Sequence, residues 1–282
     1  SKWVLNHRRN SQLVLDSVRF TECGDPQCEY CQTKLNPKSA LKDYFGYSDF
    51  RYFPGDGPIS FQEQAVSAEL RGESFITVFP TGGGKSLTYQ LPAMMRGDLK
   101  RELTVVISPL VSLMKDQVDV LETRHHNVKA VFISSLLSVL EREQAIDRVL
   151  NGGVHLLYVS PESLRSATMF RVLQSRKIAR FVIDEAHCFS AWGQDFRVDY
   201  LFIGDFIKKL QENNTPIPVS CFTATAKPQV IQDIKNYFKS RLDLDLLEFV
   251  SRAERVNLAY TVVSVSTPEE KLEKLIMLVR DS

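Results

Sequence analysis

The chain has 282 residues, of which 44% are hydrophobic and 24% are charged, and its formal net charge is +1. The length and apolar content predict one large core and part of a second, while the near-zero charge excludes a globally basic nucleic-acid-binding protein. The sequence contains no signal-peptide pattern and no apolar run of about 18 residues. We therefore expect a soluble, intracellular protein of the cytoplasm, the nucleoid or the nucleus, without a membrane partner.

The first 37 residues are polar and weakly periodic. Within them, Cys23, Cys28 and Cys31 show the close spacing that metal sites use. The low number of cysteines in the whole chain fits a reducing compartment better than a disulfide scaffold. A tetrahedral site needs a fourth ligand, which His7 or a residue further upstream would supply. Zinc, an iron–sulfur cluster and three unligated thiols are the alternatives, and of the two metal groups we expect zinc.

From about residue 38 the chain alternates between apolar, β-prone runs and helical patterns. We expect strands near residues 75–79, 103–108, 129–133, 154–159, 178–183, 217–222 and 246–250. We expect helices near residues 62–71, 86–96, 110–123, 138–150, 163–175, 199–211 and 228–239. Gly72 would end the first helix, and Ser138 with Glu141 would form a capping box at the start of the fourth. Strands that alternate with helices predict an α/β fold, in which a parallel sheet carries helices on both faces.

The first strand is followed by a glycine-rich turn and then by a helical pattern. The turn reads Pro80-Thr81-Gly82-Gly83-Gly84-Lys85-Ser86. Glycines let backbone N–H groups approach phosphate oxygens, and the N-terminus of the next helix favours the same anion. Lys85 would reach the β- and γ-phosphates, and Ser86 would ligate Mg²⁺. Because Phe79 replaces the first glycine of the strict pattern, this is a variant P-loop; the alternative is a flexible turn beside a surface lysine.

A second signal follows about a hundred residues later, where a short buried strand ends in Asp184-Glu185-Ala186-His187. Carboxylates at the carboxyl end of a strand lie where α/β sheets bind their ligands. Asp184 would hold the Mg²⁺ shell, and Glu185 would orient and deprotonate the attacking water. The alternative is a pair of acidic residues that only cap a strand.

Taken in chain order, these motifs resemble the RecQ family of ATP-dependent DNA helicases, over about residues 38–282. The blocks that carry the resemblance are 41–51 with Gln62, 79–90, 107–118, 158–162, 184–197, 222–226 and 255–258. The resemblance implies a RecA-like P-loop NTPase domain that uses ATP and Mg²⁺, with single-stranded and partly duplex DNA as the substrate and 3′–5′ unwinding as the activity.

The resemblance also implies a role for each matching residue. The nucleotide would contact Arg51, Gln62, Thr81, Gly82, Gly83, Gly84, Lys85 and Ser86, with Lys85, Asp184 and Glu185 as the catalytic residues. DNA would contact Ser108, Lys115, Trp192, Phe196 and Arg197. The ATP state would be coupled to DNA through His187, Gln194, Thr223 and Thr225. Flat aromatic side chains stack on bases and a cation binds phosphate, although core packing is the alternative for Trp192 and Phe196.

The chain departs from the family pattern near the adenine. Arg51 and Gln62 are eleven residues apart instead of the usual three, with a turn-rich insertion between them. The sequence therefore leaves open which aromatic residue stacks on adenine; the candidates are Tyr47, Phe50, Tyr52 and Phe53.

Two further departures concern the coupling of DNA to ATP. Gln194 and Val198 stand where the family commonly has histidine and proline, so coupling is expected to be altered. Nothing after residue 258 resembles the arginine-bearing motifs of a second motor lobe. We therefore expect that this chain is a fragment of a longer protein and that the remainder of that protein supplies the second lobe. The fragment alone is expected to bind nucleotide better than it hydrolyses it.

These observations divide the chain into three parts. Residues 1–37 form a cysteine-containing segment, residues 38–250 form the first motor lobe, and residues 251–282 are a linker and the start of a second lobe, with a strand at 263–265 and a helix at 271–280. The leading functional hypothesis is a DNA helicase. An ATP-switched DNA-binding module without unwinding is the alternative, and the aromatic loop after His187 disfavours an RNA helicase.

Overall fold

The structure is a computed structural model of the chain. It describes residues 19–53, 55–124, 129–192, 196–211, 216–224, 227–251 and 261–280. Its centre is one seven-stranded sheet in the order β3-β4-β2-β5-β6-β1-β7, and all strand pairs are parallel. The strands are β1 (Phe75–Val78), β2 (Leu103–Ile107), β3 (Ala130–Ile133), β4 (Leu156–Val159), β5 (Ile178–Ile183), β6 (Val219–Thr223) and β7 (Leu247–Val250). The predicted parallel α/β sheet is confirmed, and each strand lies within a residue or two of its expected position.

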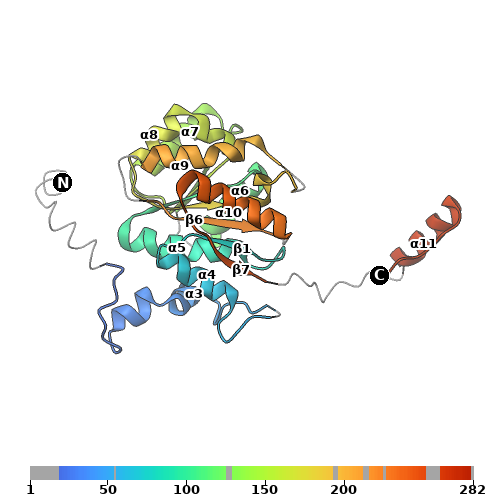
Figure 1. Ribbon diagram of the computed structural model, residues 1–282, viewed down its shortest axis with the longest axis horizontal. Helices are drawn as coiled ribbons and strands as arrows, with labels where there is room; N and C mark the ends of the chain where they lie inside the picture. Colours follow the sequence, from blue (N-terminus) through green and yellow to red (C-terminus); the bar gives the residue numbers. More distant parts are fainter. Residues whose placement is uncertain are drawn as a thin grey trace, which may run out of the picture.

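Helices connect the strands and cover the sheet (Figure 1). The α-helices are α3 (Pro37–Phe45), α4 (Phe61–Leu70), α5 (Lys85–Lys100), α6 (Val111–Arg124), α7 (Val139–Leu150), α8 (Ala167–Gln174), α9 (Ile203–Gln211), α10 (Pro228–Leu242) and α11 (Pro268–Arg280). A π-helical turn, η1 (Cys31–Leu35), precedes α3, and three 3₁₀ turns are η2 (Pro161–Arg165), η3 (Ala186–Phe189) and η4 (Val198–Phe202).

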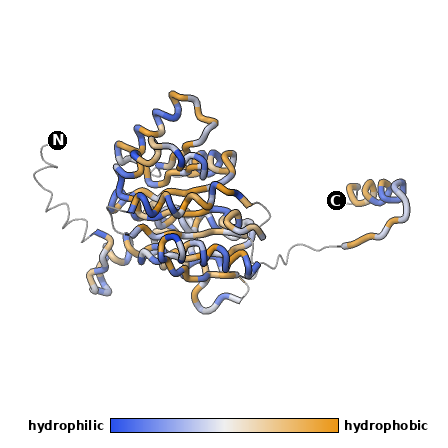
Figure 2. Tube along the Cα trace, turned by 45° about the horizontal axis from the view of Figure 1, so that its top comes forward, coloured by the Kyte–Doolittle hydropathy of each residue, from blue (hydrophilic) through white to orange (hydrophobic). Residues whose placement is uncertain are grey.

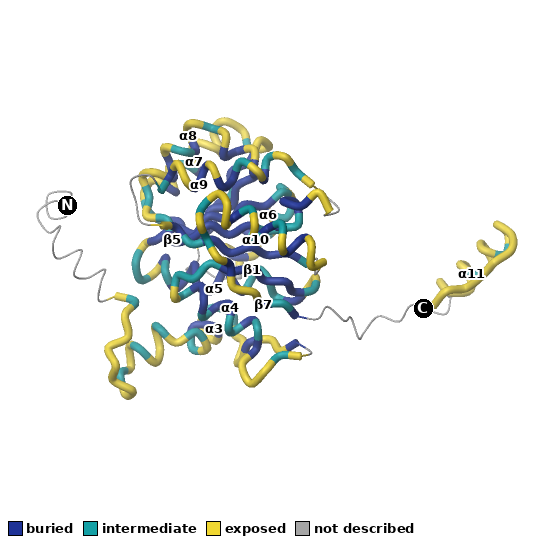
Figure 3. The backbone as a smooth tube through the Cα atoms, in the orientation of Figure 1, coloured by how far each residue is buried: buried dark blue, intermediate teal, exposed yellow. Residues whose placement is uncertain are grey.

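Two apolar clusters fill the two sides of the sheet, because successive side chains of a strand point to opposite faces. In β1, Ile76 and Val78 join the cluster beneath α7, α8, α9 and α10, whereas Phe75 joins the cluster beneath α4, α5 and α6. Apart from the edge strand β7, where Leu247 and Glu248 are exposed, the strands are largely buried and mostly hydrophobic, whereas exposed residues lie on the helices and in the segments outside the sheet (Figures 2 and 3). Helices on both faces of the sheet are therefore confirmed.

Two of the predicted helix ends are confirmed by their hydrogen bonds. The Ser138 side chain accepts from the Glu141 N–H while the Glu141 carboxylate accepts from the Ser138 N–H, which is a complete capping box at α7. Gly72 follows the end of α4 with a φ of 79°, a conformation that glycine adopts without steric cost.

The C-terminal part of the chain differs from expectation. Residues 263–265 were expected to form a strand, but the structure describes them without regular structure. A strand is stable only when it pairs with neighbours, and none of the described strands pairs with these residues. The expected helix is present as α11, whose apolar residues are largely exposed. The expected lobe-entry motif, residues 255–258, lies outside the described residues. Among the described helices, none has the length and apolarity needed to span a membrane.

Candidate nucleotide and DNA site

The predicted site residues gather at one edge of the sheet, because four neighbouring parallel strands end there. In the order of the sheet, β2 leads to Ser108, β5 to Asp184, β6 ends at Thr223, and β1 leads into the glycine loop. Backbone hydrogen bonds hold the strand ends in register: the Asp184 N–H donates to Ile107 O at 2.9 Å, and the Phe79 N–H donates to Thr223 O at 3.2 Å. Motifs that are far apart in the sequence therefore become neighbours.

The glycine loop is a cradle in which side chains would not fit. Gly82 and Gly84 have φ values of 75° and 78°. A Cβ on Gly83 would lie 2.8 Å from Pro80 O, and one on Gly84 would lie 2.4 Å from Gln62 Nε2. The Gly83 N–H donates to Pro80 O at 2.9 Å and closes the turn. Such a loop presents backbone to an anion, so the residues fit a bound triphosphate.

Lys85 and Ser86 are the first two residues of α5, where the helix N-terminus adds its partial positive charge. Lys85 Nζ donates to Phe79 O at 3.3 Å and so lies over the loop. Burial raises the pKa of Asp184, and the charge of Lys85 opposes that rise; a hydrogen bond from His187 lowers the pKa of Glu185, and the charge of Lys85 adds to that lowering. Ser86 lines the adjoining cavity, of about 490 Å³.

Asp184 is a carboxyl group in a largely enclosed position. Burial, followed by the negative charge of Glu185, raises the pKa of Asp184 to about 6. Its two oxygens accept hydrogen bonds from the Glu185 N–H at 3.0 Å and from the Ser108 hydroxyl at 3.4 Å. A desolvated carboxylate beside a lysine is a group that a cation would stabilise, so Asp184 fits a Mg²⁺-holding role.

Ser108 lies next to Asp184 at the end of β2. Ser108 was expected to contact DNA, yet its side chain is buried, with 2% exposed, and its hydroxyl is used on Asp184. The side chain is therefore not accessible to DNA in this structure. The sequence block that contains Ser108 gives no sign of this burial.

Glu185 has a left-handed backbone, with a φ of 48°, at the start of η3. This conformation is unfavourable for a residue with a Cβ, and such strain is concentrated at functional sites. A hydrogen bond from His187 is the main cause that lowers the pKa of Glu185. His187 Nδ1 lies 3.2 Å from Glu185 Oε2 and 3.4 Å from Thr223 Oγ1, so it bridges the carboxylate and the end of β6.

The structure reduces the choice of adenine-stacking residue. Phe50 and Phe53 are buried, with 3% and 8% exposed. Tyr52 is exposed but does not line the 490 Å³ cavity, whereas Tyr47 is 56% exposed and lines it. Of the four candidates, Tyr47 is the one that is both exposed and a lining residue of the cavity beside the glycine loop.

Arg51 and Gln62 also line this cavity. Gln62 Oε1 accepts from the Arg51 N–H at 2.8 Å, and Gln62 Nε2 donates to Gly84 O at 3.1 Å. Arg51 Nη1 donates to Gly82 O at 2.6 Å. Despite the insertion between them, both residues thus contact the glycine loop. Thr81, also expected to contact the nucleotide, is exposed on that loop.

The insertion gives Phe53, one of the four candidates for stacking on adenine, a different position. Phe53 packs on Phe79, with ring centroids 4.8 Å apart, and its ring would be 3.3 Å from a Cβ on Gly83. Asp56 Oδ2 closes the insertion by accepting from the N–H groups of Phe53 at 2.9 Å and Phe61 at 3.3 Å. The insertion therefore packs against the glycine loop through Phe53. Its turn-rich sequence has no periodic pattern that predicts this contact.

The aromatic loop follows Asp184 and Glu185 in the chain, and its described residues include Trp192, Phe196 and Arg197. Trp192 is 69% exposed and Phe196 44% exposed, so core packing does not explain them. Arg197 Nη1 donates to Pro109 O at 3.3 Å, which ties the loop to the end of β2. The Trp192 N–H donates to Ser190 Oγ at 3.2 Å, which anchors the start of the loop. Two expected coupling residues, Gln194 and Thr225, lie outside the described residues.

Lys115, the fifth residue expected to contact DNA, is exposed on α6. It lines a groove of about 630 Å³ between α6, β3 and α7, together with Leu136 and Arg148. Its amino group is therefore accessible, as a phosphate contact would require.

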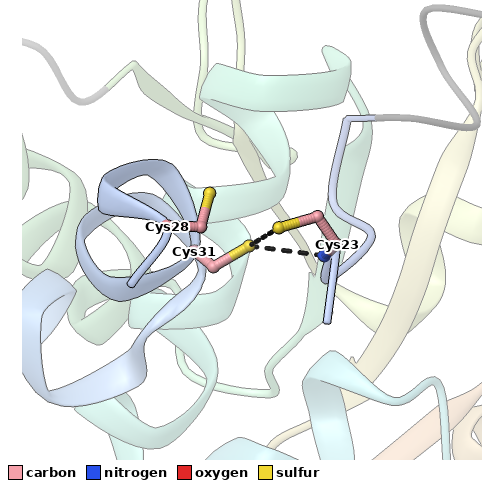
Figure 4. A group of neighbouring side chains, drawn as sticks. All are labelled: Cys23, Cys28 and Cys31. Carbon is pink, nitrogen blue, oxygen red and sulfur yellow. Dashed lines mark hydrogen bonds between the residues drawn. The ribbon is translucent and has the colours of Figure 1, made fainter. Parts of the chain in front are cut away.

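The three N-terminal cysteines lie together (Figure 4). Their sulfur atoms are all within 4.8 Å of one another, and those of Cys23 and Cys31 are 3.5 Å apart. The Cys23 N–H donates to Cys31 Sγ at 3.4 Å. A hydrogen bond from the Cys31 backbone is the main cause that lowers the pKa of the Cys28 thiol. His7, the expected fourth ligand, lies outside the described residues.

Comparison with known proteins agrees with this geometry. The family model described as DEAD/DEAH box helicase matches residues 59–234. The chain is 36% identical over 239 residues to the ATP-dependent DNA helicase RecQ of Haemophilus influenzae, covering 85% of this chain and 35% of that protein. It is 36% identical over 249 residues to the probable ATP-dependent DNA helicase RecS of Bacillus subtilis, covering 88% and 45%. The chain thus spans less than half the length of these relatives.

Among solved structures, the helicase MrfA bound to DNA superposes with a TM-score of 0.58 at 20% identity, over 81% of this chain and 31% of that chain. This similarity supports the RecA-like fold alone. The family match covers the glycine loop, the carboxylates and most of the sheet, and the two relatives match over 85% and 88% of the chain. The chain belongs to the DEAD/DEAH box helicases and, within them, to the RecQ family.

Proposed function

We propose that this chain is the first motor lobe of an ATP-dependent DNA helicase that unwinds duplex DNA with 3′–5′ polarity. The observation that carries the proposal is the convergence of the glycine loop, Asp184, Glu185 and Thr223 at the ends of neighbouring strands. The named activities of the relatives support it, and so does the exposed aromatic loop beside the carboxylates.

The residues around the glycine loop have separate tasks in this proposal. The loop amides and Lys85 bind the triphosphate, Tyr47 with Arg51 and Gln62 borders the base, and Ser86 with Asp184 would hold Mg²⁺. The metal, when bound, supplies positive charge against the phosphates. Glu185 orients the attacking water and accepts its proton, which its lowered pKa permits at neutral pH. Phosphoryl transfer needs mainly this positioning and charge compensation.

We propose that DNA reaches this site through the aromatic loop. Trp192 and Phe196 would stack on bases, while Arg197 and Lys115 would contact phosphates. His187 lies between Glu185 and Thr223, so a movement of β6 or of the loop after β5 would change the hydrogen bond to the base. A second lobe from the remainder of the protein would close over the nucleotide.

The test is an ATPase and unwinding assay on the complete protein, with and without single-stranded DNA. We expect DNA-stimulated turnover, unwinding of duplexes with a 3′ tail but not a 5′ tail, and loss of both in Lys85→Ala. Lys208→Ala, an exposed lysine of α9, is the control and should keep both activities. ATP binding without unwinding would support the alternative of an ATP-switched DNA-binding module, and stimulation by RNA alone would exclude a DNA helicase.

We also propose that Cys23, Cys28 and Cys31 hold one zinc ion. Thiolates are preferred ligands of zinc, and in a tetrahedral site with bonds of about 2.3 Å the sulfur atoms lie roughly 3.8 Å apart. The observed sulfur separations are close to this spacing. Elemental analysis of the purified protein should find about one zinc per chain, and Cys28→Ser should lose it. A protein without zinc or iron above background would contradict the assignment.

A further inference from the structure

The three cysteines come from two different stretches of backbone (Figure 4). Cys23 lies in the irregular segment that begins near Phe20, whereas Cys28 and Cys31 flank the first turn of the helix that continues through η1 towards α3. An ion bonded to all three sulfur atoms would therefore join the incoming chain to the helical part. It would close the loop between Cys23 and Cys31 with metal–sulfur bonds, where the ends of the loop are otherwise joined by weak hydrogen bonds to sulfur, such as that from the Cys23 N–H to Cys31 Sγ at 3.4 Å.

The segment that contains this loop has little else to hold it on the lobe. None of the described residues from 19 to 36 is buried. Its main contact with the lobe is Phe20, whose ring lies 4.9 Å from the Arg96 guanidinium and 5.4 Å from the Lys100 amine, both on α5. Cation–π contacts at such an accessible site contribute only about 0.5–1 kcal/mol each. Phe20 also packs against the apolar cluster that contains Leu41 and Met95, but it is itself only half-buried. The segment therefore has one apolar anchor and no fully buried side chain, and a metal cross-link would add a second point of attachment.

We propose that the metal site is a structural clasp that holds residues 19–36 against α3 and α5 and keeps Phe20 on Arg96 and Lys100. This inference rests on the proposed zinc site and assigns its purpose. With Cys23 released, the half-buried Phe20 is the one apolar anchor left to the segment, and the chain before η1 separates from the lobe more readily. With the ion bound, the path of the polypeptide that enters the motor lobe is fixed relative to α3.

The clasp is separate from the nucleotide site. Arg96 lies eleven residues beyond Lys85 on α5, which is about 16 Å along the helix axis. Helix α3 also has its own hold on the lobe: Leu41 is 1% exposed, the Tyr44 hydroxyl donates to Asp98, and Lys38 pairs with Glu63 at 3.3 Å. Opening the clasp should therefore free the segment while leaving nucleotide binding unchanged.

The experiment is limited trypsin digestion of the complete protein with a zinc-selective chelator, followed by mass spectrometry. Arg19 and Lys34 are trypsin sites at the two ends of the clasped segment. Chelation should accelerate cleavage at both by at least tenfold, and Cys28→Ser should show the fast rate without chelator. The affinity for a fluorescent ATP analogue should stay within twofold in each case.

The variant Phe20→Ala tests the docking of the segment independently of metal binding. This variant should keep about one zinc per chain and yet be cleaved faster at Arg19, because the segment no longer docks. If zinc is present but chelation and Phe20→Ala leave cleavage unchanged, the clasp is wrong and the zinc site stands. If no metal is found, the zinc proposal fails and the clasp fails with it. If a reductant alone accelerates cleavage, a disulfide and not a metal closes the loop, and both are overturned.

Discussion

Glu185 is the residue whose surroundings differ most from those of an ordinary surface carboxylate. Its backbone is left-handed, its carboxylate receives a hydrogen bond from His187, and Lys85 adds positive charge nearby. All three features hold an ionised carboxylate in one place, as a general base requires. Asp184, one residue earlier, is half-buried by solvent exposure, and desolvation raises its pKa. Two adjacent acidic residues therefore have opposite electrostatic environments.

The first prediction concerns Glu185→Gln in the complete protein. Glutamine keeps the size of the side chain and can still contact His187, but it does not accept a proton. We expect ATP affinity to stay within a few-fold, while turnover falls by about 10²–10⁴-fold. Single-turnover kinetics with labelled ATP would measure both quantities. Glu143→Gln on the exposed face of α7 is the control; wild-type turnover in Glu185→Gln would mean that another residue is the base.

The second prediction concerns the cost of burying Asp184. The folded protein raises its pKa from 3.8 to about 6. Below about pH 4 both the folded and the unfolded states are protonated at this group, so there is no cost. Above about pH 6 the folded state contains a buried carboxylate, and stability is lost as the pH rises between these values.

Asp184→Asn removes this cost. Asparagine can keep the contacts with the Glu185 N–H and the Ser108 hydroxyl. The variant should be about as stable as the wild type near pH 4 and more stable by about 2–3 kcal/mol above pH 6. Urea unfolding without Mg²⁺ or nucleotide would measure this difference. Asp243→Asn is the control with the opposite sign, because a hydrogen bond from Lys239 lowers the pKa of Asp243. A pH-independent difference for Asp184→Asn would contradict the prediction.

At the scale of elements, the aromatic loop between η3 and η4 follows Asp184 and Glu185 in the chain and exposes the rings of Trp192 and Phe196. Phe196→Ala should reduce DNA stimulation of the ATPase with a weak dependence on salt, because stacking releases few counterions. Arg197→Ala should weaken DNA binding with a smaller salt slope, because a phosphate contact is lost. Fluorescence anisotropy at several salt concentrations would separate the two. Val198→Ala, exposed beside them, is the control; full DNA stimulation in both test variants would exclude the loop from coupling.

The insertion between Arg51 and Gln62 is the second element with a testable task. Phe53→Ala would remove the ring that packs on Phe79 behind the glycine loop. We expect the KM for ATP to rise several-fold with a smaller change in kcat, because the loop amides become less well positioned. Phe53→Leu, which keeps most of the packing volume, should restore the KM. An unchanged KM in Phe53→Ala would mean that the insertion does not support the loop.

At the scale of the whole molecule, the described residues of the nucleotide site all lie at the carboxyl ends of the strands of this one domain. If a second lobe completes the site, this chain alone should bind Mg-ATP with an affinity close to that of the complete protein but hydrolyse it far more slowly. An arginine supplied from outside a phosphate site is worth about 10³–10⁵ in rate. Calorimetry and steady-state ATPase assays on both proteins would measure the difference. Equal turnover numbers would contradict a shared site.

The sequence by itself determined the fold class, the glycine loop and the two strand-end carboxylates. These features are local patterns: a run of apolar residues, a glycine-rich turn, or acidic residues directly after a strand. The parallel-sheet rule then brings strand ends together without any knowledge of side-chain contacts. Pairing with neighbours is not local, which is why the strand expected at residues 263–265 was wrong.

Only the tertiary structure decided which side chains reach the site. Tyr47, Phe50 and Phe53 are similar in sequence context, yet Tyr47 faces the cavity, Phe50 joins the core cluster beside α3, and Phe53 packs on Phe79. Ser108 follows a strand as Asp184 does, yet its side chain is only 2% exposed and its hydroxyl donates to Asp184. Burial is set by contacts between residues that are distant in the sequence, so local composition alone does not determine it.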